Sequence, residues 1–485
     1  MVVLSMSNYW IHRAMYKNRK TCFTQSAKVG VALFFLALLN NSIQAQPLTV
    51  PPNEHPVLRT IQASVEAKRI KKDVTQLVNF GTRHTLSDIK SDQNGIGAAR
   101  RWIKSEFDKI STQCGGCLEV IYQKQTFSDH KRIPEPTEVV NVIAIQRGVK
   151  DPDRYIVMSG DIDSRVTDPL DSTSISPGAN DNASGIAGVI EAARVLSHYQ
   201  FDGTVVYAAL SGEEQGLFGG KVMAETAQKE NWRVEAVINN DMIGNIAGIN
   251  GVINNTTARV FSEGIRYVET EQEAKLRRFT GGEVDSASRN VARYIDKIAD
   301  DYIPNLNVMM VYRLDRFARG GHHRPFNKVG YPAVRIMETN EHYDRQHQNI
   351  RNENGRQYGD VLSGVDFNFN AKLTSLNAVT LASMAWAPPP PASVEISGAV
   401  KPSTTLAWQR PKGKMAKDLA GFRVHWRLTT DATWTNSQYV GDINNFELKN
   451  IVIDNYFFGV SSVSKEGFES PVVFPGPAGS FGDYN

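Results

Sequence analysis

Cysteine is scarce in this chain, with three residues among 485, at positions 22, 114 and 117. Cys22 precedes a predicted cleavage site, so the mature chain can form at most one internal disulfide, between Cys114 and Cys117. In an oxidising compartment Cys-Gly-Gly-Cys can close a small disulfide loop, and two free thiols or a redox site are the alternatives. A thioredoxin-type pair opens a helix after a strand, whereas this pair lies in a Gly-containing loop after a helix. We therefore expect the disulfide.

An excess of charge of one sign is also missing, since 54 basic residues face 51 acidic ones and the net charge is +3. No basic stripe interleaved with aromatic residues follows the N-terminus, so nucleic acid is not an expected partner. The 41% of apolar and 22% of charged residues are an ordinary balance for a globular protein, and the length allows two or three domains. The composition leaves the oligomeric state open.

A long hydrophobic run is the third absence. The apolar stretch Val29–Leu39 is about half as long as the ~20 residues that a membrane-spanning helix needs. Basic residues precede it, and Ile43-Gln44-Ala45 follows as a cleavage site, which is typical of an export signal; an uncleaved membrane anchor is the alternative. We predict a signal peptide over residues 1–45, a secreted or periplasmic mature protein, and no stable membrane span after cleavage.

Acidic side chains are present where short apolar segments end. Tyr155–Met158, Thr204–Leu210 and Val237–Asn239 each indicate a buried strand, and the carboxyl ends of such strands open into the crevice where α/β proteins bind ligands. Half a dozen carboxylates there would repel one another unless they were protonated or held metal. Oxygen ligands with one or two imidazoles suit a pair of divalent ions. The acids are Asp161, Asp163, Asp181, Glu213, Glu214 and Asp241.

The adjacent Glu213 and Glu214 fit two roles at one site. Two divalent ions about 3.5–4 Å apart can share a carboxylate and a water, and they lower the pKa of that water. One glutamate then binds metal while its neighbour takes the proton of the water and passes it to a leaving amine. Taken singly, such acids are more often helix caps, turn residues or solvated side chains. Their joint order after apolar strands is what favours a metal site.

Strands and helices alternate along most of the chain. Apolar residues at helical spacing predict helices over Val57–Phe80, Gly95–Ile110 and Ala183–Leu196, and Pro332–Met337 indicates a further strand. The alternation predicts an α/β fold, a three-layer sandwich around a mainly parallel mixed sheet. The polar segment between residues 244 and 304 is interpreted as a lid or a decoration.

A run of four prolines, Pro388–Pro391, forms a stiff spacer and marks a domain boundary. Beyond it, short predicted strands separated by polar turns are spaced as in a small all-β sandwich, with Trp408 and Trp426 suited to its core. This last part resembles a fibronectin type III domain.

Five blocks follow one another between residues 139 and 348. They are Asp-Ile-Asp-Ser from Asp161, Pro-Gly-Ala-Asn-Asp-Asn-Ala-Ser-Gly from Pro177, Gly-Glu-Glu-Gln-Gly-Leu-Phe-Gly from Gly212, Asn-Asp-Met-Ile-Gly from Asn240 and His-Arg-Pro-Phe-Asn-Lys-Val-Gly-Tyr-Pro-Ala from His323. This set resembles one known family, the co-catalytic zinc aminopeptidases of metallopeptidase clan MH, which include bacterial leucyl aminopeptidases. The resemblance implies the zinc aminopeptidase, phosphorylase/hydrolase-like fold. Together with the N-terminal pattern and the proline run, it gives three predicted parts: the signal peptide 1–45, a zinc peptidase domain 46–387 and the β-sandwich 388–485.

Carried over position by position, the resemblance implies a role for each acid. Asp181 bridges two zinc ions, and Glu214 and Asp241 are each a ligand to one of them. Glu213 is the general base, and Asp163 supports the first ligand from behind.

The resemblance also implies a final imidazole ligand after the last strand. His347 is expected to be that ligand because the motif places it several residues past a Glu, and His342 is the alternative. The family often has Tyr before this His, whereas this chain has Gln346, so an oxyanion-stabilising Tyr is not expected at this position.

One departure affects the first ligand, because this chain has Asp161 where the family usually has His. Aspartate can bind zinc, but the extra negative charge would favour manganese or cobalt relative to the family's two zinc ions. Asp163 would then face a carboxylate in place of an imidazole, so one of the two is expected to hold a proton. His322, which stands where relatives often have an acid before His323, is proposed to offset the charge at Asp161.

Three functions follow from these residues. The first is an exported metallo-aminopeptidase, a hydrolase that acts on peptides with a free N-terminus. The second is a single-zinc glutaminyl cyclase, and the third is a catalytically silent binding protein on the same scaffold. Retention of Glu213 with the other expected ligands argues against the third.

Overall fold

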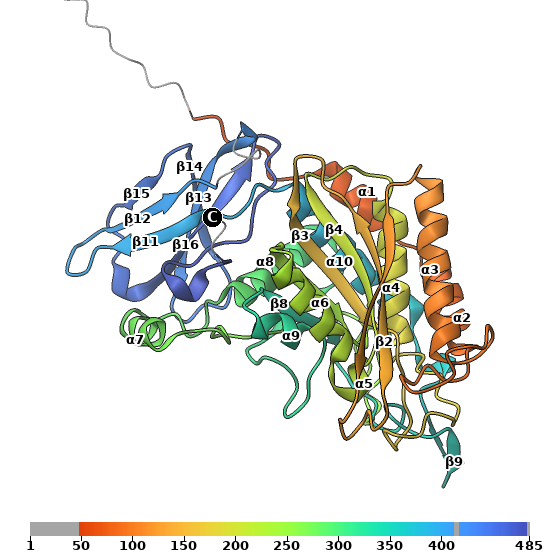
Figure 1. The fold of residues 1–485 in the computed structure, drawn as a ribbon. Helices are drawn as coiled ribbons and strands as arrows, with labels where there is room; N and C mark the ends of the chain where they lie inside the picture. The colour runs from red at the N-terminus through yellow and green to blue at the C-terminus, as the bar shows by residue number, and fades with distance from the viewer. Residues whose placement is uncertain (1–47, 412–416, 483–485) are drawn as a thin grey trace, which may run out of the picture. The chain divides into compact units, whose positions relative to one another are not determined.

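The structure is a computed structural model that describes residues 48–411 and 417–482, so the predicted signal peptide lies outside the described residues. At its centre is an eight-stranded sheet, shown in Figure 1. Its strands in spatial order are β1 (Glu119–Phe127), β2 (Thr137–Gln146), β4 (Gly203–Leu210), β3 (Asp151–Asp161), β5 (Arg233–Asn240), β8 (Ala333–Glu338), β6 (Thr257–Ser262) and β7 (Asn307–Val311).

The sheet is mixed, with parallel pairs at its centre. β3 is parallel to both β4 and β5, β5 is parallel to β8, and β6 is parallel to β7. The pairs β1/β2, β2/β4 and β6/β8 are antiparallel. The central strands are buried on both faces, which is consistent with the continuous apolar runs over residues 155–158 of β3 and 205–210 of β4.

Helices cover both faces of this sheet and complete three layers. Successive residues of β3 alternate between two apolar clusters, with Ile156 and Met158 in one and Tyr155 and Val157 in the other. This confirms the predicted α/β sandwich. The first face is covered by α1 (Pro56–Ser64), α2 (Ala67–Val78), α3 (Gly95–Gln113), α4 (Ala183–Leu196), α8 (Ala287–Tyr302) and α10 (Phe367–Trp386), and the second by α6 (Phe218–Lys229) and α9 (His323–Lys328).

The prediction of one helix over Val57–Phe80 is wrong, because the backbone is extended at Val65 and Glu66, between α1 and α2. The backbone N–H of Glu66 donates to Glu191 Oε1 of α4 over 2.9 Å, and Arg69 binds the same carboxylate. A tertiary contact to a buried acid therefore interrupts a helical pattern that continues on either side.

The segment between residues 244 and 304 is part of the fold rather than only a lid or decoration. Its strand β6 lies between β8 and β7, and its helix α8 packs on the same face as α10. A second helix, α7 (Glu271–Thr280), begins with a capping box in which Thr270 and Glu273 bond each other's backbone. β6 was missed because it is short and carries Arg259 within the sequence Thr-Ala-Arg-Val-Phe-Ser.

The C-terminal part consists of two small antiparallel sheets, in agreement with the expected all-β arrangement. The rings of Trp408 and Phe422, one from each sheet, lie 5.4 Å apart between centroids in a shared core. The closer resemblance to a fibronectin type III domain stays a prediction. One sheet has the order β11 (Ala392–Ser397), β12 (Thr404–Gln409), β15 (Asn445–Leu448), and the other β14 (Asn436–Gly441), β13 (Leu419–Leu428), β16 (Tyr456–Ser464).

A buried ion-pair cluster joins the second of these sheets to the residues just before α8. Both carboxylate oxygens of Asp285 accept from Arg427 of β13 over 2.9 Å, and Arg293 of α8 donates to the same acid over 2.8 Å. All three side chains are almost completely buried. Residues 48–482 accordingly lie in one compact unit, and the domain boundary after residue 387 stays a prediction.

Two expectations concern covalent and membrane features. Cys114 and Cys117 are joined by a disulfide, as expected. In the described part of the chain, no helix is long and apolar enough to cross a membrane.

Candidate metal centre

Most of the predicted site residues stand where central strands end. β3 ends at Asp161, with Asp163 two residues later, and Asp241 directly follows β5. Glu213 and Glu214 form the first turn of a short helix, α5 (Glu213–Gly216), just after β4. Since β4, β3 and β5 are parallel neighbours, these ends meet at one edge of the sheet.

Three of the expected ligands converge on a common point. His347 Nε2 lies 3.0 Å from Asp181 Oδ2 and 2.9 Å from Glu214 Oε1. Across the described residues, this is the one group of three or more His, Cys, Asp or Glu side chains whose ligand atoms all lie within 4.8 Å. His347 itself has a left-handed backbone (φ 54°), which a non-glycine residue adopts at a small cost in energy where its surroundings hold it.

The charges of this group favour a cation between two carboxylates. Burial opposes protonation of His347, but the negative charge of Glu214 and the bond to Asp181 raise the pKa of the imidazole to about 9. In turn, His347 keeps the pKa values of Asp181 and Glu214 below their usual range, although burial opposes this. An imidazole that gives up its proton leaves three ligands facing the place where a divalent ion fits.

Arg165 orients Glu214 and lies against His347. Its Nε donates to Glu214 Oε2 over 2.7 Å, and its Nη2 lies 2.8 Å from His347 Nδ1. Because Arg165 takes the Oε2 atom of Glu214, the Oε1 atom is directed toward His347 and Asp181.

Asp181 is positioned by an acid from a distant loop. Its backbone N–H donates to Asp360 Oδ2 over 2.7 Å, and the backbone N–H of Asn180 donates to the same carboxylate. The peptide bond between Asp181 and Asn182 is cis. Burial raises the pKa of Asp360 to about 7.

Asp163 supports the two glutamates through their backbone. Its carboxylate accepts the N–H groups of Glu213 over 3.2 Å and Glu214 over 3.0 Å, together with the hydroxyl of Thr85 over 3.0 Å. Burial, followed by the charge of Glu214, raises its pKa to about 6. Asp163 therefore orients the turn that carries both glutamates.

Asp161 is engaged by protein groups at both oxygens. Asn182 Nδ2 donates to Asp161 Oδ2 over 2.8 Å, and His322 Nδ1 lies 3.0 Å from Asp161 Oδ1. The contact expected between His322 and Asp161 is therefore present. Burial lowers the pKa of His322 to about 3, so His322 is neutral and contributes a hydrogen bond, not the positive charge that the sequence led us to expect. Burial and the charges of Asp241 and Asp163 raise the pKa of Asp161 well above its usual value.

The positive charge in this half of the site comes from Arg335 of β8 and, farther from Asp241 Oδ2 at 3.9 Å, from Arg316. Arg335 Nη2 lies 2.7 Å from Asp241 Oδ2, and its Nη1 donates to Asp315 Oδ1 over 3.1 Å. Burial raises the pKa of Asp241 to about 6 even though Arg335 opposes the rise. Burial also disfavours the charge on Arg335, but Asp241, Asp315 and then Glu213 and Asp161 outweigh it and raise the pKa of the guanidinium above its ordinary value.

Glu213 lies next to the three-ligand group without being one of its members. Burial, followed by the negative charges of Glu214, Asp241 and Asp161, raises the pKa of its carboxyl well above the usual value. A carboxyl whose neighbours favour the protonated form is suited to accept and return a proton.

His342 is not among the three converging ligands. It borders a very small cavity whose walls also include Asp181, Glu338 and Gln346. Gln346 accepts from Arg319 over 3.0 Å and lies against Met242.

The donors in the two halves of the site differ in what they can hold. Asp181, Glu214 and His347 provide two carboxylates and one imidazole around one point, which suits a zinc ion with a coordination position left open. Asp161 and Asp241 do not belong to a comparable second group of described residues. Asn182 and His322 contact the two oxygens of Asp161, and Arg335 contacts Oδ2 of Asp241. The residues therefore fit one divalent ion, and the second ion that the resemblance implies does not fit this arrangement.

Several residues of the site were not singled out from the sequence. Arg335 had a signal, because a charged residue in the otherwise apolar run Pro-Ala-Val-Arg-Ile-Met needs a buried partner. Arg165, Asn182 and Asp360 are ordinary loop residues in sequence, and nothing local marks them as partners of the site.

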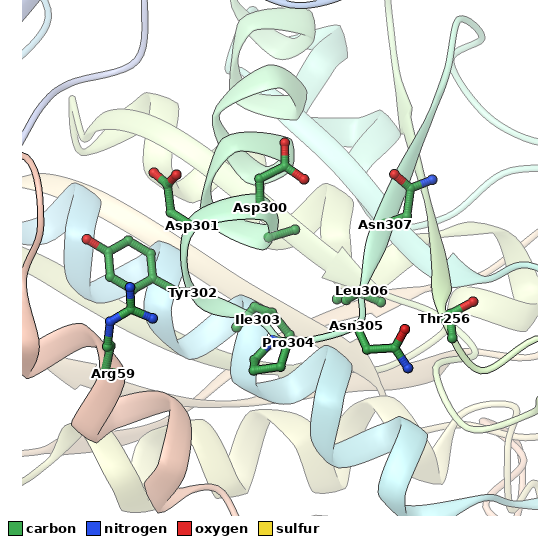
Figure 2. A pocket seen from close by; sticks show the side chains of 11 residues that line it. Arg59, Thr256, Asp300, Asp301, Tyr302, Ile303, Pro304, Asn305, Leu306 and Asn307 are labelled. Carbon is green, nitrogen blue, oxygen red and sulfur yellow. The ribbon is translucent and has the colours of Figure 1, made fainter.

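A larger cavity lies elsewhere and contains none of the predicted site residues. It has a volume of about 490 Å³ and is lined by Arg59, Thr256 and residues 299–307 at the end of α8 and the start of β7, as Figure 2 shows. Its lining combines two exposed acids, Asp300 and Asp301, with Tyr302 and a proline, and it brings together no set of metal ligands.

Comparison with known proteins bears on both the fold and the site. The sequence model of peptidase family M28 matches residues 141–365 of the chain. A probable zinc metalloprotease from Pyrenophora teres f. teres is 41% identical over 430 residues, which cover 88% of this chain and 88% of that protein. A probable zinc metalloprotease from Leptosphaeria maculans is 42% identical over 421 residues, or 86% of this chain and 97% of that protein.

Among solved structures, the LapA aminopeptidase of Legionella pneumophila superposes with a TM-score of 0.50 at 18% identity. The superposition covers 70% of this chain and 78% of that one. At this level of identity the likeness concerns the fold.

Proposed function

The chain belongs to peptidase family M28, and from this premise we propose that it is a zinc-dependent aminopeptidase that releases N-terminal residues from peptides. The observation that supports the proposal best is the convergence of Asp181, Glu214 and His347 beside Glu213. The relatives named probable zinc metalloproteases, which match most of the chain, favour the same metal.

When bound by these three residues, zinc supplies a Lewis acid that polarises the peptide carbonyl and lowers the pKa of a nearby water. Glu213 takes the proton of the attacking water and passes it to the leaving amine. Asp163 holds the backbone of Glu213 and Glu214, and so fixes the turn that carries both the proposed base and one of the residues that would hold the metal. Asp360 holds the backbone of Asp181 in the same way from the opposite loop.

A second candidate is a glutaminyl cyclase, because a three-ligand group for one ion also fits that chemistry. The two functions separate in one experiment. The purified mature protein, loaded with zinc, is given leucine p-nitroanilide and a peptide with N-terminal glutamine. Release of p-nitroaniline supports the aminopeptidase, and cyclisation of the glutamine without hydrolysis supports the cyclase. Bound zinc with neither reaction would point to a binding protein on this scaffold.

The number of metal ions that the site binds is part of the proposal. The family resemblance implies two zinc ions, with Asp161 and Asp241 completing the second set, and Asp161 in place of the usual His makes manganese or cobalt alternatives. The hydrogen bonds and ion pair that engage Asp161 and Asp241 favour one ion.

We also propose that the protein is exported. The predicted signal peptide over residues 1–45 carries this proposal, and the disulfide between Cys114 and Cys117 is compatible with an oxidising compartment. The C-terminal sheets are proposed to be a fibronectin type III-like domain that begins after the proline run at 388–391.

A further inference from the structure

We propose that the guanidinium of Arg335 stands in the place of the second metal ion, so that the site binds one divalent ion per chain. The inference rests on the proposed function, because it concerns the number of ions in the same site. It assigns to a side chain the positive charge that a co-catalytic ion would supply near Asp241, Asp161 and Glu213.

The position of Arg335 is the first argument. Arg335 lies on the central strand β8, and its side chain is completely buried. Nη2 is 2.7 Å from Asp241 Oδ2 and also donates to the backbone carbonyl of Asp241 over 3.3 Å. The acid expected to bind the second ion thus already faces a fixed cation at charged hydrogen-bond distance.

The other end of the guanidinium holds it in this position. Nη1 donates to both carboxylate oxygens of Asp315, over 3.1 and 3.2 Å, and to the backbone carbonyl of Gly320 over 2.8 Å. Arg335 cannot swing away from Asp241 without giving up its hydrogen bonds to Asp315 and to the carbonyl of Gly320 in a buried place, which is unfavourable.

Asp161 supplies the second argument. As the first expected ligand, it would have to bind an ion through an oxygen that already accepts from Asn182 or contacts His322. His322 is itself completely buried, so it cannot turn out to solvent to make room. Both acids of the expected second set are therefore engaged by protein groups.

The three-ligand half of the site is different. The atoms that face one another there are Asp181 Oδ2, Glu214 Oε1 and His347 Nε2, and they are linked through a proton on the imidazole. A metal ion can replace a proton on histidine, whereas it cannot replace a covalently attached guanidinium. The acid cluster thus contains one position where a metal ion can replace a proton, at His347, and one permanent positive charge, on Arg335.

The test is the zinc content per chain, measured by mass spectrometry after equilibration with buffered zinc and confirmed by calorimetric titration. We expect one equivalent in the wild type, none in Asp181→Asn, and one in both Asp161→Asn and Asp241→Asn. Two equivalents in the wild type, with one lost in Asp241→Asn, would overturn the inference and leave the proposed function intact. No zinc in the wild type and no hydrolysis would instead overturn the proposed function, and the inference with it.

A second pair of variants tests the role of Arg335 itself. Arg335→Gln removes the nearer of the two guanidinium groups that face Asp241, the other being Arg316 at 3.9 Å. A second equivalent of zinc is then expected to bind beside Asp241 while Asp161 keeps its bonds to Asn182 and His322. The matched double variant Arg335→Gln/Asp241→Asn is expected to return to one equivalent. A folded Arg335→Gln protein that still binds one equivalent, or a double variant that keeps two, would contradict the assignment. If Arg335→Gln does not fold, the wild-type and Asp241→Asn measurements still decide the ion count.

Discussion

Arg165 donates a hydrogen bond from Nε to Oε2 of Glu214 over 2.7 Å. The contact leaves the other oxygen of Glu214 directed at the three-ligand group and ties the metal site to the loop after β3. We predict that Arg165→Met weakens zinc binding about 10- to 100-fold, because groups that orient metal ligands typically contribute that much.

Arg132 offers a matched control, since it donates to the backbone carbonyl of the same glutamate and not to its carboxylate. Arg132→Met should leave the zinc dissociation constant close to that of the wild type. Equal effects of the two variants, measured by competition with a fluorescent chelator, would show that Arg165 does not act through the carboxylate.

The two histidines after β8 give a second prediction. His347→Ala should remove bound zinc and activity, because it deletes one of three ligands. His342→Ala should retain zinc, because His342 is not among the three converging ligands. Zinc content per chain is the measurement, and loss of zinc in His342→Ala alone would exchange the two assignments.

Glu213 is expected to transfer protons without binding the metal. Glu213→Gln should lower kcat for leucine p-nitroanilide by about 10²- to 10⁴-fold, which is the usual contribution of a general base. Its zinc content should equal that of the wild type, because Asp181, Glu214 and His347 remain. If hydrolysis persists at the wild-type rate, Glu213 is not the base.

Asp296 gives a prediction about pH and stability. Burial in α8, followed by the charge of Asp300, raises its pKa from 3.8 to about 6. The folded protein therefore holds a proton that the unfolded chain releases, and this stabilising effect is complete below pH 3.8 and is lost as the pH rises through about 6. Asp296→Asn should raise the free energy of unfolding by about 2 kcal/mol at pH 8 and change it little at pH 4.

Denaturant melts at the two pH values test this expectation. The exposed Asp153 is a suitable control, and Asp153→Asn should stay within about 0.5 kcal/mol of the wild type at both. A larger stabilisation by Asp296→Asn at pH 4 than at pH 8 would contradict the assignment.

The ion pair between Asp285 and Arg427 predicts that the C-terminal sheets stabilise the peptidase part. Arg427→Met leaves a buried aspartate with one fewer partner and should lower the free energy of unfolding by about 3 kcal/mol. Arg410→Met breaks an exposed pair with Asp442 and should cost less than about 1 kcal/mol. Similar losses in both variants would mean that the buried pair contributes no more than a surface contact.

The edge of the sheet where the acids meet could be predicted from the sequence. Short strands with continuous apolar residues, buried on both faces, indicate a parallel sheet. Because ligands bind at the carboxyl ends of such strands, Asp161, Glu214 and Asp241 are expected at one edge of the sheet. The same local patterns located α4 at its observed bounds, Ala183–Leu196. These inferences succeed because they depend on residues close together in the chain.

The parts that could not be predicted depend on partners far apart in the chain. The break between α1 and α2 is made by Glu191, more than a hundred residues away, and no local residue breaks that helical pattern. The pairing of Arg335 with Asp241 crosses between β8 and the end of β5, so the apolar run around Arg335 indicates a buried partner without showing which acid it is. His322 was placed near Asp161 correctly, but its charge depended on burial that the sequence does not reveal.

A positive charge that belongs to the polypeptide cannot be dialysed away. Because Arg335 is paired with Asp241 from the moment the chain folds, a chelator that strips the protein of zinc would leave half of the acid cluster with its counter-charge. The apoprotein should therefore keep its shape and accept metal again on return of the ion, without first having to reassemble a collapsed pocket.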